Sequence, residues 1–230
     1  MARCRSPLVA FLLLSFVVAP ALCFLLGLCF GSILAAVEKW TLGQGFWYVV
    51  NNMAGTPPLG NATATSTVGV AVDVAVSTVS LVFASTVVGV SGMLVWVSTL
   101  PDRLGLTTVP RGLLAMVFVI PLCVVVCCAL FGLVIAGAEG VDFVTAFTYT
   151  VSTVCGLGNP LTDWAPATTH GAVIVAVVGV AAQGLIGVII GIAGGIAPLV
   201  AAVDQFDRAF DPDAVQEVQQ EATSVVPPGP

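Results

Sequence analysis

Residues 143–171 read FVTAFTYTVSTVCGLGNPLTDWAPATTHG. About ten moderately apolar residues come first, a segment with alternate glycines follows, and a stretch rich in proline and polar residues comes last. About ten residues are too few to cross a bilayer as a helix, but they suit a helix that enters the membrane and turns back. Irregular backbone at that depth is tolerated only where protein buries it or where it lines a water-filled cavity. The stretch therefore predicts a re-entrant helix and loop.

Long apolar runs surround this stretch. The four runs cover roughly residues 7–36, 68–98, 112–137 and 170–201. Each exceeds the ~20 residues that a membrane-spanning helix needs. The whole chain is 58% hydrophobic and 8% charged, which is more apolar surface than a soluble domain of this size can bury. We predict an all-α membrane protein with four transmembrane helices and two re-entrant loops.

The basic residues predict the orientation of the chain. With the N-terminus in the cytoplasm, five arginines lie inside and Lys39 alone lies outside, as the positive-inside rule requires. The arginines are Arg3, Arg5, Arg103, Arg111 and Arg208. The first apolar run is about twice as long as the core of a cleavable signal peptide, so we expect a retained helix. Both termini are then cytoplasmic, including an acidic, proline-rich tail at 204–230, and the sequence does not indicate which membrane the protein occupies.

The chain also carries an internal repeat. When the sequence is shifted by 101 residues, a proline, a Phe-Gly pair, a glutamate and a tyrosine each meet the same residue type. The matched pairs are Pro20 with Pro121, Phe30-Gly31 with Phe131-Gly132, Glu38 with Glu139, and Tyr48 with Tyr149. One inserted residue then brings Gly69, Gly89 and Gly92 onto Gly171, Gly191 and Gly194. We predict two tandem copies, 1–100 and 101–203, each made of a helix, a short helix, a glycine-rich loop and a helix.

The repeat and the glycine-rich loop together indicate a pore. An even number of spans in each copy gives both copies the same orientation, so they are related by an axis along the membrane normal. Alternate glycines at 154–159 allow successive carbonyl groups to point the same way, and a ring of carbonyls can replace the hydration shell of an ion. The helix expected from Asp142 to about Thr153 directs its negative C-terminal end at that ion.

This second copy resembles the pore loop of potassium channels. Its segment Val154-Cys155-Gly156-Leu157-Gly158-Asn159 is similar to the T-V-G-Y-G filter that follows the pore helix in that family, and Pro166-Ala167-Thr168 and Gly171 resemble the start of the inner helix. Two such repeats in one chain are the organisation of two-pore-domain potassium channels. The resemblance covers roughly residues 7–200 in architecture and is specific only across 142–195. It implies two chains around one pore with fourfold pseudosymmetry, a permeant potassium or other monovalent cation, no cofactor, and a gating hinge at Gly184 and Gly187.

The filter residues depart from the family pattern. In the second copy Val154 occupies the place of the threonine, unless Thr153-Val154 is aligned with the family's Thr-Val and Cys155 is an insertion. In the first copy an ungapped alignment places Met53-Ala54-Gly55-Thr56 in the filter, and Pro57 then fixes φ near −65° where the family has glycine. A shifted register instead matches Leu59-Gly60-Asn61 to Leu157-Gly158-Asn159. The sequence leaves both registers open, so a weakly selective pore or a non-conducting subunit is the alternative to a potassium channel.

Several polar residues in or near the apolar runs are further candidates. A carboxylate inside a membrane helix is costly and marks function by default. Asp73 is expected to brace the short helix through Tyr48, Asn51 or Asn52, or to be a protonated or snorkelling group near the interface. Gln183 faces the pore cavity or joins neighbouring helices, and Thr153 belongs to the filter support. Glu38 and Glu139 form an outer acidic ring or are solvated helix ends.

Other classes of function fit the sequence less well. The chain has no basic patch for nucleic acid, a single histidine and no CxxC pair, so metal chemistry and Cys/His catalysis are not expected. A small transporter is a third hypothesis, and the parallel repeat and the absence of buried charge pairs argue against it. We therefore expect a non-enzymatic homodimer in the lipid bilayer, with a heteromeric channel partner as the other possible assembly.

Overall fold

The computed structural model describes residues 7–57, 62–106, 108–156, 161–196, 200–201 and 203–205. Over these residues the chain is helical, with no strand. The first half contains α1 (Pro7–Leu13), η1 (Leu14–Val18), α2 (Ala19–Glu38), α3 (Leu42–Ala54), α4 (Thr67–Gly92), α5 (Val95–Ser98) and α6 (Leu100–Arg103). The second half contains α7 (Val109–Leu114), η2 (Ala115–Val119), α8 (Ile120–Glu139), α9 (Phe143–Val154) and α10 (Thr169–Gly194).

Four continuous helical stretches are long and apolar enough to cross a membrane, as the sequence predicts. They are Leu8–Glu38, Thr67–Gly92, Val109–Glu139 and Thr169–Gly194. The second and fourth end earlier than the apolar runs suggest, at Gly92 instead of 98 and at Gly194 instead of 201. The residues beyond are apolar because they pack against protein: Val97 in α5 is fully buried, and Ile196 is buried against Leu106 and Ala115.

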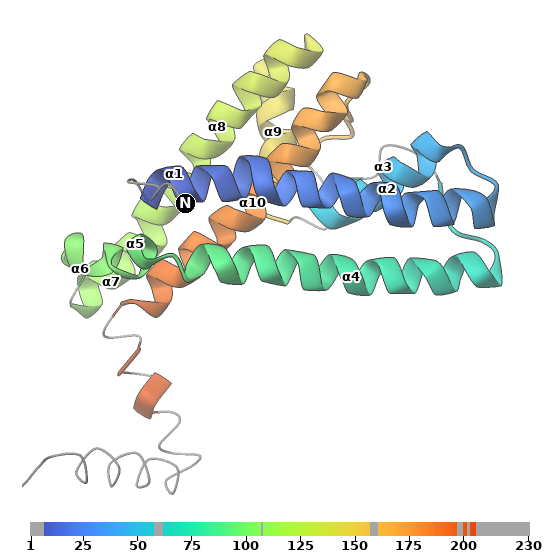
Figure 1. Cartoon of the computed structure of the whole chain (residues 1–230). Coiled ribbons are helices and arrows are strands. Elements are labelled where there is room, and N and C mark those ends of the chain that lie inside the picture. Colours follow the sequence, from blue (N-terminus) through green and yellow to red (C-terminus); the bar gives the residue numbers. More distant parts are fainter. Residues whose placement is uncertain are drawn as a thin grey trace, which may run out of the picture.

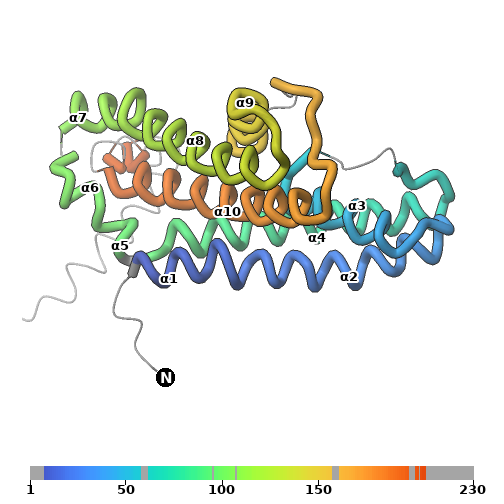
Figure 2. Tube along the Cα trace, turned by 90° about the horizontal axis from the view of Figure 1, so that it is seen from above, coloured from blue at the N-terminus to red at the C-terminus, as the bar shows by residue number. Residues whose placement is uncertain are grey.

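The fourth span is the central helix of the molecule. Of its most apolar stretch 56% is buried, compared with 28% for α4, 22% for the first span and 11% for the third. Figure 1 shows α4 running alongside the long α1–α2 helix, while α8 and α10 slope across them. Figure 2 shows α10 between α8 on one side and the α1–α2 helix on the other. The other spans expose most of their apolar surface, which lipid can cover.

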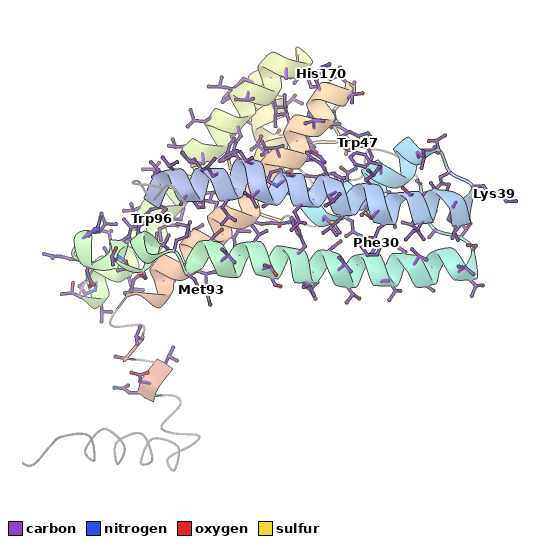
Figure 3. The ribbon with its side chains drawn as sticks, viewed as in Figure 1. Phe30, Lys39, Trp47, Met93, Trp96 and His170 are labelled. Carbon is purple, nitrogen blue, oxygen red and sulfur yellow. The ribbon has the colours of Figure 1, made fainter. Side chains whose placement is uncertain are left out.

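The ends of the spans carry the polar and amphipathic side chains. Figure 3 shows Lys39 at one end of the long first helix and Trp96 near its opposite end, with mostly carbon side chains along its length. Leu25 and Leu28, which lie between these ends, are 58% and 57% exposed. This distribution suits a helix whose middle contacts hydrocarbon and whose ends meet the polar interface.

Each outer helix contains one π-helical turn just before a proline. The turns are η1 and η2, and Pro20 and Pro121 follow them in the first turn of α2 and α8. Proline lacks the N–H that an α-helix uses at this point, and a π-turn is one of the recognised ways for a helix to accommodate such an interruption. The two turns lie 101 residues apart, the same offset that relates the two halves of the sequence.

The central helix crosses α4 at close range because both helices carry glycine at the crossing. A Cβ placed on Gly92 would lie 2.8 Å from the carbonyl oxygen of Gly187, and one on Gly191 would lie 2.5 Å from the carbonyl oxygen of Gly92. Real Cβ atoms are not found so close to backbone. Small residues at such crossings allow helix backbones to approach in a membrane.

Candidate functional site

The two short helices, α3 and α9, begin with a side-chain cap. Thr41 Oγ1 accepts a hydrogen bond from the Gln44 N–H (3.2 Å), and Gln44 Oε1 accepts one from the Thr41 N–H (3.0 Å), which makes a capping box. In α9, Asp142 Oδ1 accepts from the Thr145 N–H (3.0 Å). The hydrogen bonds from Thr145 hold the pKa of Asp142 below its ordinary value. The helix expected from Asp142 to about Thr153 is thus present as Phe143–Val154.

A glycine in the left-handed conformation follows each short helix: Gly55 with φ 66° comes directly after α3, and Gly156 with φ 60° comes after Cys155 at the end of α9. After α3 the Thr56 N–H donates to the Asn51 carbonyl (3.0 Å), and the Gly55 N–H donates to the Asn52 carbonyl (3.4 Å). This is a Schellman arrangement, in which glycine is favoured because a Cβ is strained at positive φ. The two left-handed glycines therefore occupy equivalent positions, 101 residues apart.

Glycine also allows each short helix to pack closely on the outer helix before it. A Cβ on Gly31 in α2 would lie 2.6 Å from the Phe46 backbone nitrogen in α3. At the equivalent crossing, a Cβ on Gly132 in α8 would lie 3.0 Å from the Phe147 Cα in α9. The first crossing is the tighter one.

A glutamate at the end of each outer helix holds the start of the following inner helix. Glu38 accepts from the Ser66 N–H (2.9 Å), the Ser66 hydroxyl (2.6 Å) and the Thr65 hydroxyl (3.1 Å). Glu139 accepts from the Ala167 N–H (2.9 Å), the Thr168 N–H (3.3 Å) and the Thr168 hydroxyl. The sequence suggests a cation-attracting ring or solvated helix ends for these two glutamates, whereas the carboxylates are engaged in capping the inner helices.

The two glutamate clamps depend on small residues at the start of the inner helices. A Cβ on Gly69 would overlap the carboxylate of Glu38, and a Cβ on Gly171 would overlap that of Glu139. This role was not predicted from the sequence. The signal was present, because Gly69 and Gly171 match in the repeat, as the two glutamates do.

The filter candidates of the first half lie at the end of α3. Met53 and Ala54 are the last two helical residues and are buried, at 1% and 2% exposure. Gln183 Nε2 on α10 donates to the carbonyl oxygen of Met53 (2.7 Å). That carbonyl is therefore held by a side chain of the other half. Gly55 and Thr56 follow the helix, whereas the alternative register Leu59, Gly60 and Asn61 lies outside the described residues.

The filter candidates of the second half lie at the end of α9. Val154 is its last helical residue and packs with Cys128 and Ala182, whereas Cys155 and Gly156 are exposed. Leu157, Gly158 and Asn159 lie outside the described residues. Thr153 directs its hydroxyl to the Tyr149 carbonyl of its own helix (3.1 Å). The Leu161 N–H donates to Ser152 Oγ (2.9 Å), so this hydrogen bond joins the backbone at residue 161 to the last turn of α9.

Asp73 bonds to one of the three partners that its position suggests. Tyr48 Oη donates to Asp73 Oδ1 (2.9 Å), so α3 is tied to α4 by a side-chain hydrogen bond. In the second half the equivalent Tyr149 is 2% exposed and packs edge-on against Trp164, with ring centroids 5.0 Å apart. Val175 occupies the position equivalent to Asp73 and is buried in the same cluster.

The two glycines assigned to a hinge by family resemblance lie at close helix contacts. A Cβ on Gly184 would lie 2.7 Å from Ser15 Oγ in η1, and one on Gly187 would overlap the Val88 carbonyl in α4. Their small size is therefore needed for packing, and their role as a hinge stays a prediction. Ser15 is itself fully buried, a position that the sequence analysis did not single out.

Comparison with known proteins does not place the chain in a family. No protein-family model, no curated protein and no solved structure matches it.

Proposed function

We propose that the protein is a pore-loop cation channel of the potassium type, built from two tandem copies of one unit. α3 and α9 are its re-entrant pore helices, and the segments that follow Gly55 and Gly156 are its filter walls. The supporting observation is the shared construction of α3 and α9. Each is capped at the same position, packs on the outer helix through a glycine and is followed by a left-handed glycine, with a glutamate clamp closing the loop behind it.

The ion path lies beyond the ends of the two short helices. Met53, Ala54 and Val154 are still helical, so they support the filter and direct the negative ends of the helices toward it. The carbonyls from Gly55 and Gly156 onward are those that replace the hydration shell of a potassium or other monovalent ion. Two chains then supply four such walls around one axis, with both termini in the cytoplasm.

The gate belongs to the inner helices in this proposal. α10 touches the end of α3 through Gln183 and crosses α4 through Gly187, so a tilt of α10 changes the support of the first filter wall. Asp73 and Gln183 are the bracing residues of that wall, and Thr153 belongs to the support of the second. No cofactor takes part, and the permeant cation is the ligand.

A non-conducting subunit is the second candidate function. Pro57 has no N–H and a fixed φ, and the Met53 carbonyl already accepts a hydrogen bond from Gln183. Both features favour a first wall that supports the assembly without coordinating ions.

Ion flux distinguishes these functions. Purified protein in liposomes is expected to pass potassium down its gradient, and Gly156→Ala combined with Gly158→Ala is expected to abolish the flux without dissociating the dimer. The matched control is Gly137→Ala in α8, where a Cβ meets no atom within 4 Å. Absence of flux from intact wild-type dimers would support the non-conducting subunit, and saturable transport of a solute would support a transporter.

A further inference from the structure

Two buried serine hydroxyl groups in the spans have no hydrogen-bond partner among the described residues. They belong to Ser15 in η1 and to Ser91 near the end of α4, and both residues are 0% exposed. A buried hydroxyl without a partner is costly, and the hydrocarbon of a bilayer has no water to offer it. In native proteins such groups are nearly always satisfied by protein or by an ordered water molecule.

Other hydroxyl groups in the spans bond to their own helix. Four serine or threonine side chains donate to the carbonyl four residues earlier: Ser32, Thr78, Ser80 and Thr86. This local bond satisfies a hydroxyl in the middle of a helix without any other partner. Neither Ser15 nor Ser91 makes it, so the orientation of these two side chains has another cause.

Both hydroxyl groups lie beside Gly184 of α10. A Cβ on Gly184 would stand 2.7 Å from Ser15 Oγ and 3.4 Å from Ser91 Oγ. Because both distances are measured to the same point, the two oxygen atoms are no more than about 6 Å apart, and they are not bonded to each other. One water molecule joins two oxygen atoms up to about 5.5 Å apart, with a normal hydrogen bond to each. The two serines are therefore placed so that a single water molecule can connect them.

The backbone of η1 adds a third oxygen without a donor. In a helix, the Ser15 carbonyl accepts from the N–H group four or five residues further along. The Ala19 N–H is bonded to the Leu14 carbonyl instead, and Pro20 has no N–H. Ala19 is 3% exposed, so protein covers this turn. The proline therefore leaves the Ser15 carbonyl as a buried acceptor close to the hydroxyl group of the same residue.

The second half has the same proline turn without the two hydroxyl groups. In η2 the Met116 carbonyl loses its donor to Pro121 in the same way. Under the repeat, Met116 occupies the position of Ser15, and Ala193 occupies that of Ser91. The proline turn is therefore common to both halves, whereas the paired hydroxyl groups are a feature of the first half.

We infer that one water molecule is bound between η1, α4 and α10, beside Gly184. It accepts a hydrogen bond from one serine hydroxyl, and it donates to the other hydroxyl and to the Ser15 carbonyl. These are about the three hydrogen bonds that a buried water molecule makes in proteins. The bound water joins the first outer helix to both inner helices and involves no filter residue, so the inference goes beyond the proposed function.

A density map of the full chain in which water molecules are visible tests the site directly. One peak is expected within hydrogen-bond distance of Ser15 Oγ, Ser91 Oγ and the Ser15 carbonyl oxygen. The peak is expected to be lost in Ser15→Ala combined with Ser91→Ala. A map without the peak would overturn the inference, whether the hydroxyl groups bond to each other or to the carbonyls four residues earlier.

Thermal unfolding in detergent provides a second readout. Ser15→Ala and Ser91→Ala each remove one partner of the water, and each is expected to lower the Tm by about 2–4 °C. The double variant is expected to lose less than the two single losses added together, because the two serines share one water molecule.

The matched control is Ser80→Ala, which removes a buried hydroxyl that is bonded within its own helix (2.8 Å). Its effect is expected to add fully to that of Ser15→Ala. An unchanged or higher Tm in either single variant, or full additivity of Ser15→Ala and Ser91→Ala, would contradict the bound water. Neither measurement depends on ion flux, so the result is independent of whether the protein is a channel.

Discussion

The two halves of the molecule hold their short helices, α3 and α9, in place through different contacts. In the first half, Tyr48 on α3 donates a hydrogen bond to Asp73 on α4. In the second half, Tyr149 on α9 lies deep in an apolar cluster with Trp164 and Val175, and its hydroxyl has no hydrogen-bond partner among the described residues. A hydrogen bond requires a defined distance and angle, whereas an apolar cluster tolerates small displacements of the helix. The first wall of the proposed pore is therefore the more firmly oriented one.

The largest expected difference between the halves concerns the crossing of the outer and short helices. Gly31→Ala places a Cβ 2.6 Å from backbone and is expected to cost about 2–3 kcal/mol of stability, whereas Gly132→Ala, at 3.0 Å, is expected to cost about 1 kcal/mol or less. Thermal unfolding in detergent measures both. The control Gly137→Ala has free space and is expected to gain up to about 1 kcal/mol from helix propensity. Equal losses of stability in Gly31→Ala and Gly132→Ala would show that the two helix crossings are equally tight.

The tyrosines provide the next comparison. Tyr48→Phe leaves the Asp73 carboxylate without its donor and is expected to cost about 1.5–3 kcal/mol. Tyr149→Phe removes a hydroxyl that bonds nothing in the described structure, and it is expected to be neutral or slightly stabilising. The same unfolding assay measures both, and Tyr48→Phe combined with Asp73→Val should restore part of the loss. A costly Tyr149→Phe would show that the second hydroxyl has a partner.

Gln183 supports the end of α3 through a hydrogen bond, and its replacement compares the two short helices. Gln183→Leu removes the hydrogen bond to the Met53 carbonyl and is expected to cost about 1 kcal/mol. Hydrogen exchange should then quicken in the last turn of α3 and not in the last turn of α9. Faster exchange throughout the molecule in Gln183→Leu would indicate general destabilisation instead.

The smallest expected effect is a difference in acid sensitivity between the two helix caps. The pKa of Asp142 is lower in the folded protein than its ordinary value, so its contribution to stability is present above about pH 4 and is lost as the pH falls through the folded pKa. The cap of α3 uses Thr41 and Gln44, which do not titrate. Acidification should therefore raise exchange in the first turn of α9 more than in that of α3, and the excess should disappear in Asp142→Asn. An equal response of the two helices would refute this.

Much of the architecture follows from patterns that a single sequence displays. Apolar length predicts the four spans, and the ten-residue length of the apolar part predicts the short helix from 143 onward. The ends of the second and fourth spans were misjudged because Val97 and Ile196 are apolar for packing within the protein, and composition does not distinguish that from lipid contact. The clamps formed by Glu38 and by Glu139 were not predicted, because their partners lie 27 to 29 residues further along the chain.

The candidate site was predicted less completely. The sequence named Tyr48 as one of three possible partners of Asp73, and the structure contains that hydrogen bond. It did not predict that Gln183 would reach Met53, a contact across 130 residues. The filter assignments stay predictions in both halves, since the decisive residues 157–159 and 59–61 lie outside the described part of the chain.

The glutamate clamps have a consequence for the order in which the chain assembles. Each clamp joins the last residue of one span to the first turn of the next, and the Glu38 clamp closes a loop of about 28 residues without any residue of the second half. Because closing so short a loop has a modest entropic cost, and because domains tend to fold in the order of their synthesis, we expect the first hairpin to close while the ribosome is still translating the second. The nascent first half would then present α10 with a prepared surface when that helix enters the bilayer.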